Sequence, residues 1–202
     1  MIQVKLDGND VGFDHPGANT IADVVGSVSQ ALDTDLRIIK VSFNGEDITG
    51  QPERHLQVIN GEGSFELETA RALDLANETL ESIVDFHGAV VKELNRTSEE
   101  FRTGSFEKAN DFLLRCVDGM HVLLRTTHSV TTLLQVNVTD VSAGQQNLEV
   151  LTGKISSILD EVVQAQENRD AILIADLIEY ELLVQLEDWA AGLTNLQTMG
   201  QS

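Results

Sequence analysis

The spacing of the hydrophobic residues changes near residue 68, and this change constrains the fold more than any other feature. Before residue 68 the hydrophobic residues occur in short alternating runs, which is the pattern of strands. After residue 68 they recur at spacings of three and four over long stretches, which is the pattern of amphipathic helices. We therefore expect an α+β chain with a small N-terminal domain over residues 1–68 and a helical domain over residues 69–202.

The segment 1–68 contains strong local signals for a turn and for one helix. Asn44-Gly45 separates two apolar runs and is typical of a tight hairpin turn. Thr20 is suited to be a helix N-cap, and Asp23 stands at the capping-box distance from it. The expected elements, in order, are strand 1–7, short strand 11–13, helix 21–32, strand 37–43, brief strand 46–48 and strand 64–68.

This order of elements resembles the ubiquitin-like β-grasp family. The residues that carry the resemblance are Thr20-Ile21-Ala22-Asp23-Val24 at the helix start, Val41-Ser42-Phe43-Asn44-Gly45-Glu46-Asp47-Ile48, and the closing strand 64–68. The resemblance implies a β-grasp module over residues 1–68 that serves for docking or packing. A conjugated modifier needs a free Gly-Gly end, whereas here the closing strand runs into Thr69-Ala70-Arg71.

The remainder of the chain predicts a long antiparallel, mostly four-helix bundle. Three apolar seams are followed by a fourth helical segment, and together these occupy residues 73–94, 106–134, 141–165 and 171–193. Seams of this kind pack in antiparallel bundles. The intervening segments are short enough to join antiparallel neighbours.

The last predicted helix differs from the others because it is apolar on two faces. One stripe consists of Ala171, Ala175, Ile178, Leu182, Leu186, Trp189 and Leu193, and the other of Leu173, Leu177, Tyr180 and Val184. A bundle needs only one stripe per helix. We expect the second stripe to pack on the N-terminal module or in a homodimer.

Tyr180 and Trp189 are the only Tyr and Trp of the chain, and both residue types suit interface anchors. Trp189 could equally fill one end of the bundle core. The residues assigned to a partner or oligomer interface are Leu173, Leu177, Tyr180, Val184 and Trp189.

No motif of a catalytic or cofactor site occurs in the sequence. There is no Gly-x-Ser-x-Gly element and no phosphate-binding glycine loop. The single cysteine, Cys116, excludes an internal disulfide and a multi-cysteine zinc site, and it stands on a helix seam. We therefore expect a protein that is not an enzyme, with no cofactor and no catalytic or metal-binding residues, and with Cys116 as a buried apolar residue.

The alternative is a metal-binding helical protein or enzyme. It would use His87, His121 and the carboxylates near Asp176 and Glu179. His87 stands on a seam, where a hydrogen-bonded histidine is the usual finding. Asp118 and His121 are one helical turn apart but point away from the seam. Asp176 and Glu179 are expected to form a solvated acidic face.

The net charge of −20 limits the class of partner. Nucleic-acid-binding surfaces are basic, and anionic membranes repel an acidic protein, so we expect neither partner. The segment Met1–Asp7 has no secretory pattern and no apolar run reaches membrane-span length, which predicts a cytoplasmic protein. We interpret the chain as a non-catalytic interaction or scaffold protein that forms a homo-oligomer. It would bind a protein partner through helix grooves or the β-grasp sheet, and a chaperone-like role is one version of this hypothesis. A regulator of a basic partner is a further hypothesis.

Overall fold

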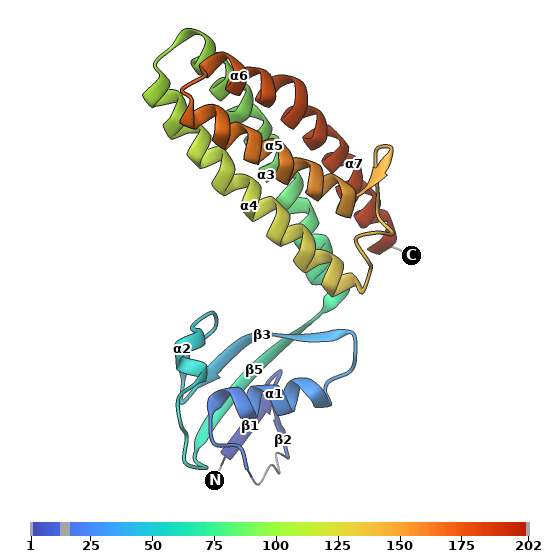
Figure 1. The fold of residues 1–202 in the computed structure, drawn as a ribbon. Coiled ribbons are helices and arrows are strands. Elements are labelled where there is room, and N and C mark those ends of the chain that lie inside the picture. Colours follow the sequence, from blue (N-terminus) through green and yellow to red (C-terminus); the bar gives the residue numbers. More distant parts are fainter. Residues whose placement is uncertain (1, 13–16, 201–202) are drawn as a thin grey trace. The chain divides into compact units, whose positions relative to one another are not determined.

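The computed structural model describes residues 2–12 and 17–200 (Figure 1). The chain is α+β and forms two compact units, Met1–Leu75 and Ala76–Ser202. The first unit contains a mixed sheet, and the second consists mainly of long helices. Among the described residues, no helix has both the length and the apolar character needed to cross a lipid bilayer.

The sheet of the N-terminal unit has five strands. They are β1 (Ile2–Leu6), β2 (Asn9–Val11), β3 (Leu36–Phe43), β4 (Glu46–Asp47) and β5 (Gly63–Arg71). Their order in the sheet is β2-β1-β5-β3-β4, with β1 and β5 parallel and the other neighbours antiparallel. Asn44 and Gly45 turn β3 into β4 with positive φ angles of 51° and 80°, which Asn and Gly adopt at low cost.

Helix α1 (Ile21–Ala31) packs its apolar side into the core of this unit, and the short α2 (Pro52–His55) follows β4. Thr20 caps α1: its Oγ1 accepts from the Asp23 backbone N–H at 3.2 Å, and the Asp23 carboxylate accepts from the Thr20 N–H at 2.8 Å. Backbone hydrogen bonds from Asn19 and Thr20 hold the pKa of Asp23 below its usual value. The predicted capping box is therefore confirmed.

Two predicted strands differ from the observed ones by two residues or more at one end. The predicted strand 11–13 corresponds to β2, which ends at Val11, and Phe13 lies outside the described residues. The predicted closing strand 64–68 is part of β5, which continues to Arg71, because residues 69–71 pair with the start of β3. Helix α3 begins at the next residue, Ala72.

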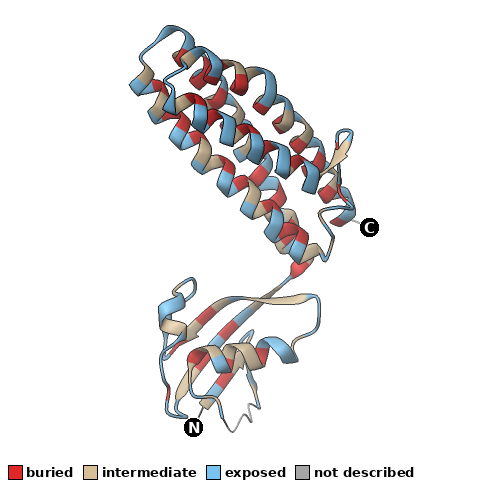
Figure 2. Cartoon of the chain, viewed as in Figure 1, coloured by how far each residue is buried: buried red, intermediate tan, exposed pale blue. Residues whose placement is uncertain are grey.

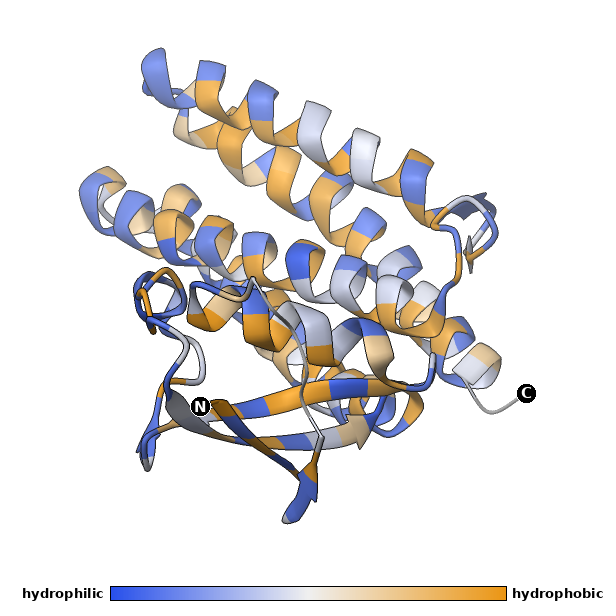
Figure 3. Cartoon of the chain, turned by 90° about the horizontal axis from the view of Figure 1, so that it is seen from below, coloured by the Kyte–Doolittle hydropathy of each residue, from blue (hydrophilic) through white to orange (hydrophobic). Residues whose placement is uncertain are grey.

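The helical unit is built from four long helical segments. These are α3 (Ala72–Thr103), α4 (Phe106–Leu134), α5 (Leu148–Glu167) and a composite segment of α6 (Ala171–Asp176), the π-helical η1 (Leu177–Leu182) and α7 (Leu183–Gly200). Ser105, Asn147 and Asp170 cap three of these segments, each accepting a backbone N–H in the first turn. Along each helix, hydrophobic residues alternate with hydrophilic ones (Figure 3), and the hydrophobic ones are mostly buried (Figure 2).

The start of the third predicted helix was wrong. Residues 141–147 are not helical. They contain a small hairpin of β6 (Ser142–Ala143) and β7 (Gln146–Asn147). Gly144 turns this hairpin with a φ of 62°, and Asn147 then caps α5. Asn195 of α7 holds the hairpin by donating to the Ser142 carbonyl oxygen at 2.7 Å.

Cys116 lies in the core of the helical unit and is 2% exposed. Burial raises the pKa of its thiol, so the reactive thiolate is disfavoured at neutral pH. The Thr97 hydroxyl lies 3.5 Å from the sulfur.

The capping box yields a first prediction. Thr20→Ala removes the side-chain acceptor for an N-terminal N–H of α1 and should destabilise the N-terminal unit by about 1 kcal/mol. Hydrogen–deuterium exchange of residues 17–71 measures this change. Ser29→Ala, at an exposed position of α1, is the control and should leave exchange unchanged. Equal exchange in the wild type, Thr20→Ala and Ser29→Ala would show that the cap does not contribute to the stability of the N-terminal unit.

Candidate functional site

The composite last segment contains a π-helical turn that redirects its side chains. A π-helix closes hydrogen bonds over one more residue than an α-helix, so an extra residue is accommodated in the turn. In η1, Leu177 and Ile178 are both buried, at 3% and 0% exposure. The prediction that Leu177 lies on an interaction stripe is therefore wrong, because that stripe assumed an uninterrupted α-helical period.

The outer side of the same segment exposes large apolar side chains. Ile172, Leu173, Tyr180 and Val184 are exposed, Tyr180 most of all at 65%. We call these four residues the α6–α7 apolar face. Ile172 was not part of the predicted stripe, yet it is 55% exposed. The adjacent apolar pair Leu177-Ile178 did not reveal the π turn, since pairs such as Leu113-Leu114 also occur in the regular helix α4.

Arginine from α3 borders this face. Arg102 donates to Asp176 at 2.7 Å and to Glu179 at 2.9 Å, and its guanidinium carbon lies 6.0 Å from the centre of the Tyr180 ring. Hydrogen bonds to these two carboxylates raise the pKa of Arg102. Asp176 and Glu179 are thus ion-pair partners of Arg102, and their side chains remain 44% and 40% exposed, in line with the solvated acidic face expected from sequence.

The residues of the metal-site alternative are not brought together. His87 is part-buried, and its Nε2 lies 2.8 Å from the Leu186 carbonyl oxygen, an arrangement that joins α3 to α7. His121 and Asp118 are exposed on α4. Within residues 2–12 and 17–200, no group of three His, Cys, Asp or Glu side chains is placed to hold a metal ion.

Trp189 lies in the core of the helical unit and is 2% exposed. Its assignment to a partner interface is therefore wrong, and the other interpretation, that it fills the bundle core, describes its position. The physical reason is that Trp189 continues the inner stripe, two turns after Leu182, and not the outer side that carries Tyr180.

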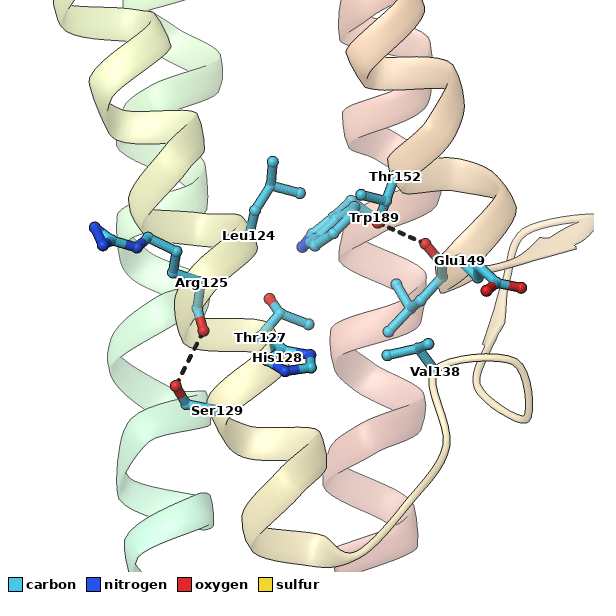
Figure 4. Close-up of a pocket in the computed structure, with 10 residues that line it drawn as sticks. Leu124, Arg125, Thr127, His128, Ser129, Val138, Glu149, Thr152 and Trp189 are labelled. Carbon is cyan, nitrogen blue, oxygen red and sulfur yellow. Dashed lines mark hydrogen bonds between the residues drawn. The ribbon is translucent and has the colours of Figure 1, made fainter.

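Beside Trp189 there is a cavity of about 570 Å³, lined from α4, α5, α7 and the loop after α4 (Figure 4). Leu124, Val138 and Leu148 contribute apolar wall, and Thr127 and Thr152 contribute hydroxyl groups. A cavity of about 520 Å³ also lies in the N-terminal unit, where Val25 of α1 and Ile38 of β3 are among its lining residues. Sequence analysis identified neither cavity.

Residues 78–192 match a domain family described as a domain of unknown function, DUF8042. The match covers more than half of the chain, so the chain belongs to the DUF8042 family. The matched range contains the α6–α7 apolar face, Trp189 and the cavity beside it. No curated protein and no solved structure matches the chain.

The π turn yields a second prediction. Leu177→Ala should destabilise the helical unit by about 2–5 kcal/mol, because it leaves a void in the core. Tyr180→Ala, three residues further on but exposed, should change the stability of the monomeric chain by no more than about 0.5 kcal/mol. Chemical denaturation of both variants measures the difference. Similar losses of stability would contradict the observed direction of these two side chains.

Proposed function

We propose that the chain is a non-catalytic protein-interaction protein that forms a homodimer through the α6–α7 apolar face. The exposure of Ile172, Leu173, Tyr180 and Val184 on one segment is the observation that carries this proposal. Clustered exposed apolar side chains mark interaction sites in soluble proteins. Tyr180 combines a large apolar ring with a hydroxyl group, which suits an interface that is partly wet.

The architecture supports an interaction role. We propose that the N-terminal unit is a ubiquitin-like β-grasp, and the support is its mixed five-stranded sheet with α1 packed into the same core. We propose likewise that α3, α4, α5 and the composite last segment form an antiparallel four-helix bundle, supported by their lengths and short connections. Since such folds host many functions, they are compatible with this role without defining the partner.

The charge of the chain determines what can hold the dimer together. Two copies, each with a net charge of −20, repel one another. Glu181 and Glu187 are exposed on the same segment as Tyr180 and Val184, so they would form an acidic rim. The apolar side chains must therefore supply the favourable energy of association. A different protein, including a client in a chaperone-like role, is the other partner that this face could bind.

The proposal predicts that the wild-type chain has twice the monomer mass of 22.1 kDa in light scattering after gel filtration. The double variant Tyr180→Glu with Val184→Glu should be monomeric, because it places charge in the centre of the face. Val163→Glu is the matched control: Val163 is also about half exposed but lies on α5, so this variant should remain dimeric.

The far-ultraviolet circular dichroism of the double variant should match that of the wild type, since both substituted side chains are exposed in the folded chain. A wild-type protein that stays at the monomer mass up to high concentration would contradict the homodimer. So would a double variant that remains dimeric.

A further inference from the structure

The cavity beside Trp189 has the properties of a small-molecule site. Its volume of about 570 Å³ is within the range of known ligand pockets, roughly 300–1,000 Å³. Leu124, Val138, Leu148 and the Trp189 ring give it a mainly apolar wall. It lies within the helical unit, apart from the α6–α7 apolar face, and so is independent of the proposed dimer.

Two buried polar atoms of the cavity wall have no hydrogen-bond partner among the described residues. They are Thr127 Oγ1 and Trp189 Nε1, and each parent residue is 2% exposed. Buried donors and acceptors are nearly always paired, and an exception calls for an explanation. Figure 4 shows the indole nitrogen on the edge of the Trp189 ring that faces α4, and the Thr127 oxygen on the side of α4 that faces the cavity.

Thr127 differs from other helical hydroxyl residues of the same unit. Thr97, Ser129 and Thr152 each donate to the backbone carbonyl one turn earlier, at 2.7–3.1 Å. This bond is available to any helical Thr or Ser, yet Thr127 does not form it. Its hydroxyl is therefore left free to bond to something else.

The charged residues at the rim do not direct their charges into the cavity. In Figure 4 the Arg125 guanidinium extends away from it, and the Glu149 carboxylate points outward. Figure 4 also draws the His128 ring beside Thr127 on the cavity side of α4, so the inward polar groups are this imidazole, an indole N–H, which can only donate, and a hydroxyl. The indole N–H and the Thr127 hydroxyl are the two that are buried without a partner among the described residues. A carbonyl oxygen complements this pair, because it can accept two hydrogen bonds. Since both atoms are shielded from bulk water, such bonds would form without competition from solvent.

We propose that the cavity binds a small, uncharged, mainly apolar molecule that carries a carbonyl-type acceptor. The acceptor takes the Trp189 N–H and the Thr127 hydroxyl, and the apolar body lies against Leu124, Val138 and Leu148.

The test uses the full chain labelled with ¹⁵N. Trp189 is the only Trp, so its indole N–H gives a single, assigned NMR signal. The probes are acetophenone, which has the carbonyl acceptor, and ethylbenzene, which has the same outline without it. Acetophenone should shift the indole proton downfield in a saturable titration, because a new hydrogen bond forms at this group.

Variants separate acceptor recognition from simple filling of the cavity. Thr127→Val should weaken acetophenone binding about fivefold, the effect of losing one neutral hydrogen bond, and should leave ethylbenzene binding unchanged. Thr152→Val is the matched control, since Thr152 lines the same cavity but its hydroxyl already donates to the Leu148 carbonyl oxygen at 2.7 Å. It should change neither affinity. Trp189→Phe, followed through the ligand signals, should weaken acetophenone binding by a similar factor.

Three results would overturn the proposal. The first is an indole signal that acetophenone does not move. The second is an equal effect of Thr127→Val on both probes, or no effect on either. The third is a shift of the indole signal with protein concentration alone in the monomeric double variant Tyr180→Glu with Val184→Glu, which would show that a second copy of the chain occupies the cavity. The circular dichroism and thermal midpoint of each variant confirm that it is folded.

Discussion

Burial of the inner side of the last helical segment is the interaction on which the helical unit depends. Ile174, Ile178, Leu182, Leu186 and Leu193 are 0–2% exposed, and α5 contacts all three parts of this segment. Each such side chain contributes about 1.5–3 kcal/mol when it is removed from water. Polar contacts from α3 then fix the position of the segment: Arg102 reaches α6 and η1, and His87 reaches the backbone of α7. Without this segment, the apolar seams of α4 and α5 would face water.

The same constraint explains why one face remains apolar and exposed. Leu177 and Ile178 are consecutive, and both are placed in the core by the π turn. The turn keeps the inner stripe continuous from Ile174 to Leu186, and it also changes which residues point outward. π-helical turns are frequent at functional sites, since they survive only where their cost is offset. In this chain the result is an outward cluster that includes Tyr180 and Val184, which the core does not need and a partner can use.

Local signals in the sequence predicted much of the fold, and signals that depend on tertiary contacts did not. The capping box of Thr20 and Asp23 and the turn at Asn44-Gly45 are encoded by neighbouring residues, and both were predicted. The burial of Leu177 was missed, because a regular period of 3.6 residues carries no information about a π turn. Trp189 stood on the inner stripe of the predicted helix, but the period alone did not decide between the core and an interface. The cavity could not be predicted at all, because Thr127 and Trp189 come from distant parts of the chain and are brought together only by packing. Membership of the DUF8042 family places this part of the chain in a recurring domain without assigning it an activity.

The central claim is that the outer side of the last segment contacts a second copy of the chain. Two-fold dimers bring the same patch of both subunits together, so a photoreactive phenylalanine analogue in place of Tyr180 tests the claim most directly. After irradiation, the account predicts a cross-linked product of twice the chain mass. Peptide mass spectrometry should join position 180 to residues of α6, η1 or α7 in the second copy. Cross-links that reach only other helices, or no intermolecular product at a concentration where the wild type is dimeric, would contradict it.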